Sequence, residues 1–563
     1  MFILEESEAQ MLIKAKKDLK ILVVVPRYNV TNSISYEYMF PLGLSYITAA
    51  IKKAGFNPEG LNLNHYNGSI ENVLNKKLSQ NKYDIVCTGG NALNYLVLKK
   101  ITDVVKLHYS KPIYIMGGPI ITSEPDLLFP DFRPDFAVLG EGEVTIVRLL
   151  EQILENINKP QNEIFANVEG IMYLKNGSLM KNPQIKQIEN IDTIEFPEMD
   201  VLGYEEFLNS QTSNFSYTHN IFDYPRIYPI LGSRSCPYHC TFCYHDTFYR
   251  RRSLDNIFSE IKYAVLKYKI NVLMILDDCF AIDHKRVNEF CDRLKDFREN
   301  LDWDLKWTCQ LTVHSAEKQL LKKMKESGCE AISYGFESYS PIVLKSMRKP
   351  ITPQQIDSAL KNTFDAHISV QGNFIFCDIA ETKETAYKTL DYWRENCKGQ
   401  VGLAFIQPYP GSEIWNYCFE NGIIKDKMLF IKEKLAPNIP FWINMTKFMT
   451  DYETHKLKKD ILKSQAQFCQ FVVPKKLKKN KKNICEITVT CPHCGQDVTY
   501  KNFRINFLYI FFYAIGKPVI CRNCNMRFFI TSKIERFAYK HYHQVRALRD
   551  FLEILKFKLK TKS

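Results

Sequence analysis

Three closely spaced cysteines are the residues of this sequence best suited to chemistry. Cys236, Cys240 and Cys243 form a C-x3-C-x2-C triplet within residues 232–244. Three thiolates can hold three irons of a cubane iron–sulfur cluster and leave the fourth iron open to a small molecule. A structural zinc site normally takes four protein ligands, and disulfide pairing needs an even number of cysteines. The triplet therefore predicts an iron–sulfur cluster, with zinc or unrelated cysteines as the alternatives.

A second set of cysteines lies late in the chain. Cys491-Pro-His-Cys494 and Cys521-Arg-Asn-Cys524 are two C-x2-C knuckles. Two such knuckles supply the four thiolates of a tetrahedral metal site. The spacing predicts structural zinc in a zinc-ribbon-like module, with a second cluster or accidental spacing as the alternatives.

Size and composition indicate a multidomain globular protein. The chain has 563 residues, of which 45% are hydrophobic and 24% charged, which is too long for one core and ordinary for a soluble protein. Its seventeen cysteines are dilute and odd in number, and residues 1–20 carry no continuous apolar leader. We therefore expect a reducing, cytoplasmic setting. The longest apolar run, residues 507–515, is about half of what a membrane span requires, so no transmembrane helix is expected.

The net charge of +13 is concentrated late in the chain. Lysine-rich runs occupy residues 475–482 and 556–562. Such runs can attract phosphate backbones or anionic surfaces, but a solvated linker and tail is the simpler interpretation.

The elements that position the glycine-rich N-terminal motifs alternate between strand and helix. We expect strands at 19–26, 83–90, 112–118 and 136–140, and helices at 41–55, 94–108 and 143–156. This alternation predicts a doubly wound parallel sheet within an N-terminal domain, residues 1–160. Five glycines fall where strands end, and they would let the backbone approach a bulky ligand or simply form tight turns: Gly89, Gly90, Gly117, Gly118 and Gly140.

A second alternation positions the cysteine triplet. Residues 161–225 look like a connecting segment, and residues 226–425 contain six strand–helix units. The expected strands are 228–232, 272–278, 306–310, 331–337, 370–376 and 401–408, and the helices 255–268, 284–299, 317–327, 352–366 and 383–395. Six such units predict a partial (β/α)6 barrel whose working face is the carboxyl end of its strands, where the triplet follows the first strand. Residues 426–484 are expected to form a helical segment, with a helix at 451–471, and a basic linker. The zinc-ribbon-like module and a basic tail then fill residues 485–563.

The triplet, with Phe242 before its last cysteine, resembles the cluster loop of the radical S-adenosylmethionine (SAM) superfamily. Over residues 20–450 the chain is similar to the class that carries an N-terminal cobalamin-binding domain. The resemblance implies a 4Fe-4S cluster on Cys236, Cys240 and Cys243 whose free iron is chelated by SAM. Electron transfer then yields a 5′-deoxyadenosyl radical that abstracts hydrogen from an unreactive C–H bond, while the protein positions and shields the reactants.

Further stretches resemble this class position by position. They are 276–280, 334–338, 372–382 and 407–412. The resemblance implies that Glu337 contacts the ribose or amino group of SAM, since a carboxylate can accept hydrogen bonds from both. Cys377 stands where the family commonly has glycine, and Thr312 near a frequent arginine, so adenosine contacts should differ in detail. The implied cofactor contacts of the barrel are Phe242, Tyr244, Asp277, Asp278, Glu337, Ser338, Gly372 and Glu381.

The N-terminal domain resembles the cobalamin domain of the same class at residues 41–46, 88–90, 117–119 and 140–143. The implied cobalamin contacts are Gly89, Gly90, Gly117, Gly118, Gly140 and Glu141. The D-x-H-x-x-G loop that supplies a cobalt ligand in many corrinoid proteins is missing, because residues 27–35 read RYNVTNSIS. His65 lies in another loop and is a weak candidate for a cobalt ligand. Members of the class can bind cobalamin without histidine.

Several functions fit these features. The leading hypothesis is methyl transfer from cobalamin to an unactivated carbon made reactive by the radical, and the alternative within the class is ring closure or rearrangement. Methylthiolation is disfavoured, because Cys87 is the only cysteine before Cys236. A hypothesis from another class is a zinc-ribbon nucleic-acid-binding factor, in which the zinc ribbon and the lysine-rich segments bind the nucleic acid and the iron–sulfur cluster is structural. Residues 522–529 and 537–542 combine basic and aromatic side chains, as base stacking requires.

The partners expected for the enzyme follow from the resemblance. They are a small-molecule, lipid or peptide substrate and an electron donor such as flavodoxin or ferredoxin. Nucleic acid is not expected as the main partner.

Overall fold

The computed structural model describes residues 13–156, 164–214, 220–245, 247–436, 441–481, 483–505, 517–533 and 535–536. The apolar run 507–515, the aromatic and basic stretch 537–542 and the lysine-rich end 556–562 lie outside the described residues. Within the described ranges, no helix is both long and apolar enough to cross a membrane.

The N-terminal domain contains a seven-stranded sheet with the strand order β2-β1-β3-β4-β5-β6-β7. Its strands are β1 (Ile21–Val25), β2 (Pro58–Asn62), β3 (Ile85–Gly89), β4 (Ile113–Gly117), β5 (Phe136–Val138), β6 (Ile171–Lys175) and β7 (Ser178–Lys181). The first five are parallel, which confirms the predicted parallel sheet, although β2 was not among the four predicted strands; β6 and β7 add an antiparallel hairpin. The helices are α2 (Leu42–Lys53), α3 (Ile70–Gln80), α4 (Tyr95–Leu107), α5 (Pro119–Thr122), α6 (Pro125–Phe132) and α7 (Gly142–Glu155). The segment expected to connect the two domains thus supplies two strands of the first sheet.

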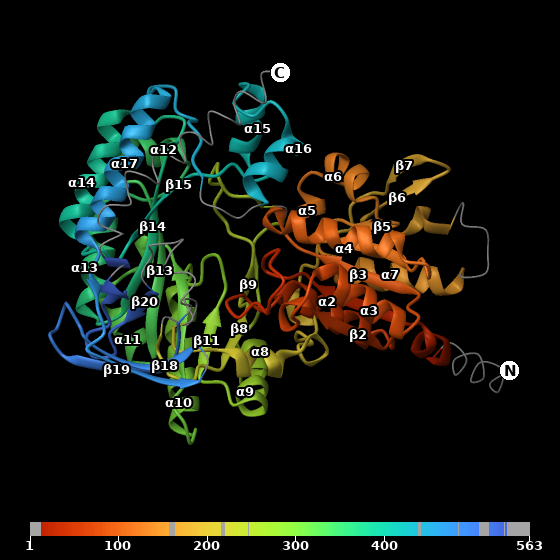
Figure 1. Ribbon diagram of the computed structural model, residues 1–563, viewed down its shortest axis with the longest axis horizontal. Coiled ribbons are helices and arrows are strands. Elements are labelled where there is room, and N and C mark those ends of the chain that lie inside the picture. The colour runs from red at the N-terminus through yellow and green to blue at the C-terminus, as the bar shows by residue number, and fades with distance from the viewer. Residues whose placement is uncertain are drawn as a thin grey trace.

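The second sheet has six strands in the order β15-β14-β13-β12-β11-β8, and all its pairs are parallel. The strands are β8 (Ile227–Ile230), β11 (Val272–Ile275), β12 (Lys306–Leu311), β13 (Cys329–Glu337), β14 (Ser369–Phe376) and β15 (Gly402–Phe405). The helices are α9 (Leu254–Tyr268), α10 (His284–Glu299), α11 (Lys318–Glu326), α12 (Pro341–Ser346), α13 (Pro353–Asp365) and α14 (Lys383–Asn396). The predicted partial (β/α)6 barrel is confirmed, and it lies beside the first domain in Figure 1.

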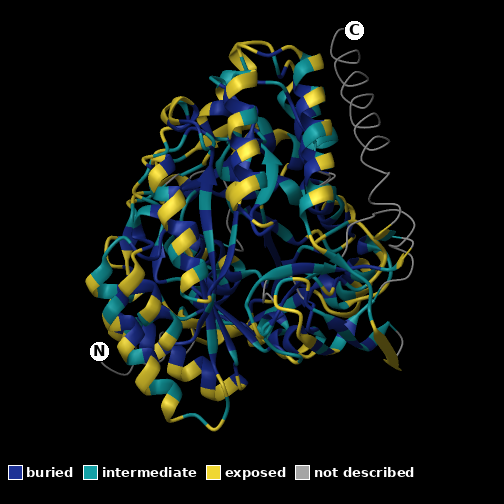
Figure 2. Cartoon of the chain, turned by 90° about the vertical axis from the view of Figure 1, so that its left-hand side faces the viewer, coloured by how far each residue is buried: buried dark blue, intermediate teal, exposed yellow. Residues whose placement is uncertain are grey.

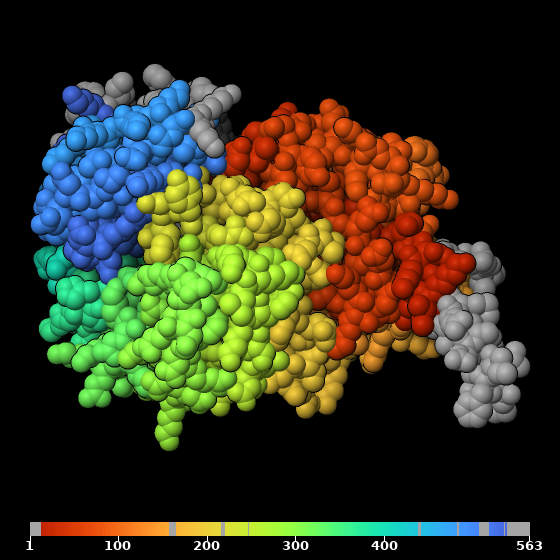
Figure 3. Space-filling model, turned by 90° about the horizontal axis from the view of Figure 1, so that it is seen from below, coloured from red at the N-terminus to blue at the C-terminus, as the bar shows by residue number. Residues whose placement is uncertain are grey.

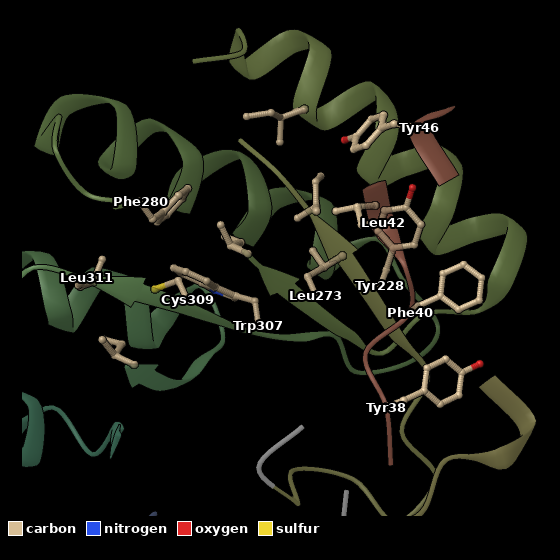
Figure 4. Close-up of a cluster of buried hydrophobic side chains, with 14 of the residues drawn as sticks. Tyr38, Phe40, Leu42, Tyr46, Tyr228, Leu273, Phe280, Trp307, Cys309 and Leu311 are labelled. Atoms are coloured by element: carbon tan, nitrogen blue, oxygen red, sulfur yellow. The ribbon is translucent and has the colours of Figure 1, made fainter. Parts of the chain in front are cut away.

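One hydrophobic core runs through both domains. The loop before α2 places Tyr38 and Phe40 against α8 (Tyr204–Ser210) of the connecting segment, where both rings contact Phe207. They belong to the same core cluster as Tyr228 of β8 (Figure 4). The ring centroids of Phe40 and Tyr204 are 4.8 Å apart in an edge-on arrangement, and Tyr204 also lies edge-on to Tyr228. Such aromatic contacts add to the free energy of burying these side chains. The two domains are therefore packed together and do not simply follow one another along the chain.

The segment after β15 returns to the first domain. It contains α15 (Glu413–Glu420), α16 (Lys427–Phe430) and a π-helical turn, η8 (Ile431–Leu435). Lys427 Nζ lies 2.8 Å from a carboxylate oxygen of Glu124, and Lys432 Nζ lies 2.9 Å from Asp131. The long helix α17 (Asp451–Phe468) then packs against α14. Figure 2 shows the exposed outer faces of the helices around buried strands.

The C-terminal module consists of two small three-stranded sheets. They contain β16 (Phe471–Val472), β20 (Lys517–Ile520) and β21 (Arg527–Ile530) in one, and β17 (Lys476–Lys481), β18 (Ile484–Thr490) and β19 (Asp497–Arg504) in the other. Figure 3 shows the module, in blue, against the connecting segment and the barrel.

The module packs on the amino end of the barrel sheet. The Asn525 amide donates hydrogen bonds to the His367 carbonyl and to Glu330, and the backbone N–H of Arg527 donates to the Gln400 side chain at 2.6 Å. Glu330 lies at the start of β13, whereas His367 and Gln400 directly precede β14 and β15. The cysteine triplet lies at the opposite, carboxyl end. The described basic residues of 522–529 are also occupied within the chain: Arg522 pairs with Asp223 at 2.7 Å. The described arginines of 522–529 are thus bound within the chain, whereas the lysines at 476–480 are exposed.

Candidate functional site

The cysteine triplet lies on a loop closed by a short two-stranded ribbon. The ribbon pairs β9 (Ser233–Arg234) with β10 (Arg250–Arg251), just beyond the carboxyl end of β8. Asp277, at the end of β11, fastens the start of the ribbon, because its oxygens accept hydrogen bonds from the Gly232 N–H and, at 2.7 Å, from the Ser233 hydroxyl. Burial raises the pKa of Asp277 to about 6 in spite of these hydrogen bonds. Asp277 thus holds the loop.

The three thiols lie among groups from several strand ends. Cys236 Sγ is 3.4 Å from Cys279 Sγ, and Cys240 Sγ is 3.8 Å from the Arg348 carbonyl oxygen. A hydrogen bond with the Cys279 thiol lowers the pKa of Cys236 to about 7, whereas burial raises the pKa of Cys240 and Cys243. Two sulfurs as close as those of Cys236 and Cys279 cannot serve different irons of one cubane. A cluster on the triplet would therefore leave Cys279 without an iron of its own.

Glu337 and Lys349 form a buried ion pair beside the triplet. Glu337 Oε1 lies 2.9 Å from Lys349 Nζ, and the two side chains are 10% and 14% exposed. Burial acts to lower the pKa of Lys349, but the charge and hydrogen bond of Glu337 and the nearby Cys240 and Cys279 together outweigh burial and raise this pKa. The charges of both residues also act on the pKa of Cys240 and Cys243. A carboxylate and an ammonium thus stand next to the loop, where the amino acid end of SAM would need partners of both signs.

We expect Lys349→Met to weaken both SAM binding and folding. Removal of one partner of a buried ion pair leaves an unpaired charge and typically costs about 3–5 kcal/mol. The free energy of unfolding in denaturant should fall by that order, and SAM affinity, measured by equilibrium dialysis, should fall by at least about tenfold. The matched control is Lys361→Met, which removes the exposed pair with Asp365 and should change stability by less than about 0.5 kcal/mol. Wild-type stability and SAM affinity in Lys349→Met would contradict this role.

The remaining barrel positions implied by the resemblance divide into two groups. The first group lies at or near the cluster loop: Phe242 and Tyr244 are on the loop, and Asp278 is exposed and lines the cavity between the two sheets. The second group is packed farther inside the barrel. Ser338 is fully buried and lies 3.2 Å from the hydroxyl of Thr389 of α14.

Gly372 and Glu381 shape the end of β14. A Cβ at Gly372, whose φ is +139°, would collide with the Tyr334 carbonyl oxygen of β13. Glu381 is fully buried, burial raises its pKa to about 8, and its Oε2 accepts a hydrogen bond from the Cys377 N–H. Cys377 has a φ of +72°, which explains why glycine suits this position. At the other position that departs from the family pattern, the Thr312 hydroxyl forms hydrogen bonds with His314 Nε2 and with the Ser315 hydroxyl.

A cavity of about 930 Å³ separates the carboxyl ends of the two sheets. On one side it is lined by the N-terminal glycines, and on the other by the cluster ribbon and the end of β11, including Arg234, Ser235 and Asp278. Ligand cavities commonly measure about 300–1,000 Å³, so this one suits a large cofactor. The implied cobalamin contacts that line it are Gly89, Gly90, Gly117, Gly118, Gly140 and Glu141.

The cavity wall has no histidine among the described residues. His65 instead bonds through Nε2 to the Tyr38 hydroxyl at 2.7 Å. The loop that replaces the D-x-H-x-x-G sequence is held by Arg27, a fully buried residue whose guanidinium donates to the carbonyls of Leu63, Tyr66 and Gly68. The residues present thus fit a corrinoid held without a histidine ligand.

The C-terminal cysteines form a compact four-thiol site. The sulfurs of Cys491, Cys494, Cys521 and Cys524 all lie within 4.8 Å of one another. The distance is 3.8 Å between Cys491 and Cys524 and 3.7 Å between Cys494 and Cys521. A tetrahedron with Zn–S bonds of about 2.3 Å has edges of about 3.8 Å. The geometry matches that of a structural zinc site.

Sequence reasoning missed Lys349, Cys279 and the arginines of the ribbon. Arg234 lies two residues before Cys236 and Arg250 at the end of the same loop, and charged residues beside a cysteine motif were a usable signal. Lys349 carried no local signal, because its pairing with Glu337 depends on the packing of the segment after α12 against the loop.

Two family models match the chain. Residues 230–392 match the radical SAM superfamily, and residues 29–150 match the B12 binding domain. An uncharacterized methyltransferase from Pyrococcus horikoshii is 26% identical over 72% of this chain and 85% of its own length. The anaerobic magnesium-protoporphyrin IX monomethyl ester cyclase of Cereibacter sphaeroides is 22% identical over 66% of this chain and 59% of its own.

A solved structure shares the fold. It is the radical SAM methyltransferase TsrM from Kitasatospora setae, with cobalamin and a 4Fe-4S cluster bound. Its TM-score is 0.57 at 14% identity, and the match covers 72% of this chain and 78% of that one.

Proposed function

The chain is a radical SAM enzyme with an N-terminal B12-binding domain, and we propose that it transfers a methyl group to an unactivated carbon of its substrate. The observation that carries the proposal is the cavity shared by the two domains. It reaches from the glycines at the ends of β3 and β4 to Ser235 and Asp278 beside the cluster loop. When bound, the cluster with SAM would supply a carbon-centred radical and the corrinoid a methyl group.

The chain's own residues hold and orient these groups. Cys236, Cys240 and Cys243 would hold the cluster, and Glu337 with Lys349 would bind the amino and carboxylate groups of SAM. The N-terminal glycines would let the backbone approach the corrinoid closely, because they present no side chains. Asp277 keeps the cluster loop in place through the Gly232 N–H and the Ser233 hydroxyl.

Two further assignments belong to the same proposal. Zinc bound by Cys491, Cys494, Cys521 and Cys524 would stabilise the C-terminal module, which the sulfur spacing supports. A soluble electron donor such as flavodoxin or ferredoxin would reduce the cluster, and the substrate would be a small molecule, a lipid or a peptide.

A second candidate is ring closure within the same class. The similarity to a magnesium-protoporphyrin monomethyl ester cyclase favours it. Extracts with and without the protein, supplied with SAM labelled in its methyl group, distinguish the two. Transfer of the label to a carbon of a product supports methyl transfer. A new product without the label, formed together with 5′-deoxyadenosine, supports ring closure.

We expect Gly43→Phe to block the corrinoid without damaging the fold. Gly43 lines the cavity in the first turn of α2, and a Cβ there would meet no atom within 4 Å. A phenyl group would therefore fill space that the corrinoid needs. Hydroxocobalamin affinity, measured by absorption titration, should fall by at least about tenfold, whereas Gly43→Ala should bind nearly as well as wild type. Equal affinity in all three proteins would place the corrinoid elsewhere.

A further inference from the structure

The base of the cluster loop is tied to the B12-binding domain by a buried group of four charged residues. Arg234 and Arg250 stand directly opposite one another in the β9–β10 ribbon. Like charges in directly opposed positions of an antiparallel pair repel each other. Here both arginines turn toward the N-terminal domain, where the residues around the start of α7 supply two carboxylates, Glu141 and Glu143.

Glu141 is shared between the two arginines. Its Oε1 lies 2.8 Å from Arg234 Nη1 and 2.9 Å from Arg250 Nη2, and its Oε2 lies 2.8 Å from Arg250 Nη1. Glu143 bonds to the second terminal nitrogen of Arg234. The Glu141 side chain is 9% exposed, that of Arg234 16% and that of Arg250 4%. Solvent and salt screen such buried pairs far less than exposed ones.

Neighbouring groups complete the arrangement. Glu141 is the N-cap residue of α7 and Glu143 lies in its first turn, where the helix dipole favours negative charge. Arg250 also donates to the Ile188 carbonyl at 2.7 Å, and Arg234 lies 5.3 Å above the Tyr46 ring. The group therefore connects the N-terminal domain, the connecting segment and both strands of the ribbon.

We infer that Glu141 and Glu143, by binding Arg234 and Arg250, fix the cluster loop relative to the corrinoid cavity and so act as positioning residues for methyl transfer. Arg234, Glu141 and Glu143 all line that cavity. A displacement of the ribbon would change the separation between the cluster and the corrinoid, and reactions between bound groups depend steeply on their placement. The inference rests on the proposed function for its purpose, but the geometric link can be tested on its own.

The test uses the full chain, reconstituted with iron and sulfide and bound to hydroxocobalamin. Glu141→Gln leaves two buried, opposed arginines without their shared anion. Amide hydrogen exchange at residues 233–236 and 249–251 should accelerate by about tenfold, because the ribbon opens more often. The distribution of distances between the cobalt(II) of the singly reduced corrinoid and the reduced cluster, measured by pulsed electron paramagnetic resonance, should broaden. The matched control is Glu169→Gln, which removes an exposed pair with Arg148 and should alter neither measurement.

Glu143→Gln provides a second arm should Glu141→Gln fail to fold. It removes one of the two carboxylate partners of Arg234 and leaves Glu141 bound to both arginines, so exchange in both strands of the ribbon should accelerate, but less than in Glu141→Gln. Wild-type exchange and distance distributions in these variants, or a larger acceleration in Glu143→Gln than in Glu141→Gln, would overturn the inference. Failure of the wild-type chain to bind hydroxocobalamin would refute the proposed function, and the exchange measurement would still decide whether the ribbon is fixed by these carboxylates.

Discussion

Cys240→Ala should abolish the reductive cleavage of SAM. Two remaining thiolates cannot hold the cubane in the loop, so no iron would be available to bind SAM. Anaerobically reconstituted and chemically reduced protein should form 5′-deoxyadenosine at a rate at least about 1,000-fold below wild type. The absorption of the cluster and the bound iron should be lost together with the activity.

Cys279→Ala is the matched control for this experiment. Cys279 is a buried cysteine whose sulfur lies 3.4 Å from that of Cys236, but it belongs to the segment that follows β11 and not to the cluster loop. If the triplet alone holds the cluster, this variant keeps its iron. Continued 5′-deoxyadenosine formation by Cys240→Ala, or loss of iron from Cys279→Ala alone, would show that another set of thiols holds the cluster.

Cys521→Ser should remove zinc and destabilise the C-terminal module. Structural zinc contributes about 10–16 kcal/mol of binding free energy in zinc-finger peptides, and that energy is available to folding. The thermal midpoint should fall by on the order of 10 °C, and the zinc content, measured by mass spectrometry of the metal, should fall to background. Because the module packs on the amino end of the barrel, the protein that remains folded at low temperature should still cleave SAM.

Cys485→Ala separates metal binding from packing in the same module. Cys485 is fully buried in β18 and lies outside the four-thiol site. This variant should lose only about 1–2 kcal/mol through a small cavity and should keep its zinc. Zinc retained by Cys521→Ser, or lost equally by Cys485→Ala, would refute the assignment.

Most of the architecture could be predicted from the sequence, because apolar runs that alternate with helical stretches mark most of the parallel strands of both sheets. Strand β2 escaped prediction because its sequence, PEGLN, has no apolar run. The β6–β7 hairpin was missed although Asn176-Gly177 between the strands is a hairpin signal.

The candidate site was predictable only where short motifs carry the chemistry. The triplet, Glu337 and the N-terminal glycines could be located in this way. The partners of Glu337 and Arg234 could not be predicted. Lys349 contacts Glu337, and Glu141 contacts Arg234, only when distant segments of the chain pack together. Glu141 shows the difference: the sequence suggested a cofactor contact, and the structure directs its carboxylate to two arginines of the ribbon.

The continuous core across the two domains limits how this enzyme can be recombined with its relatives. Phe40, Tyr204 and Tyr228 come from three successive parts of the chain and interlock. A chimera that exchanges only the N-terminal sheet would set foreign side chains against Tyr204 and Tyr228, and its halves would no longer fit. A functional exchange has to carry residues 36–46, α8 and the start of the barrel as one cassette.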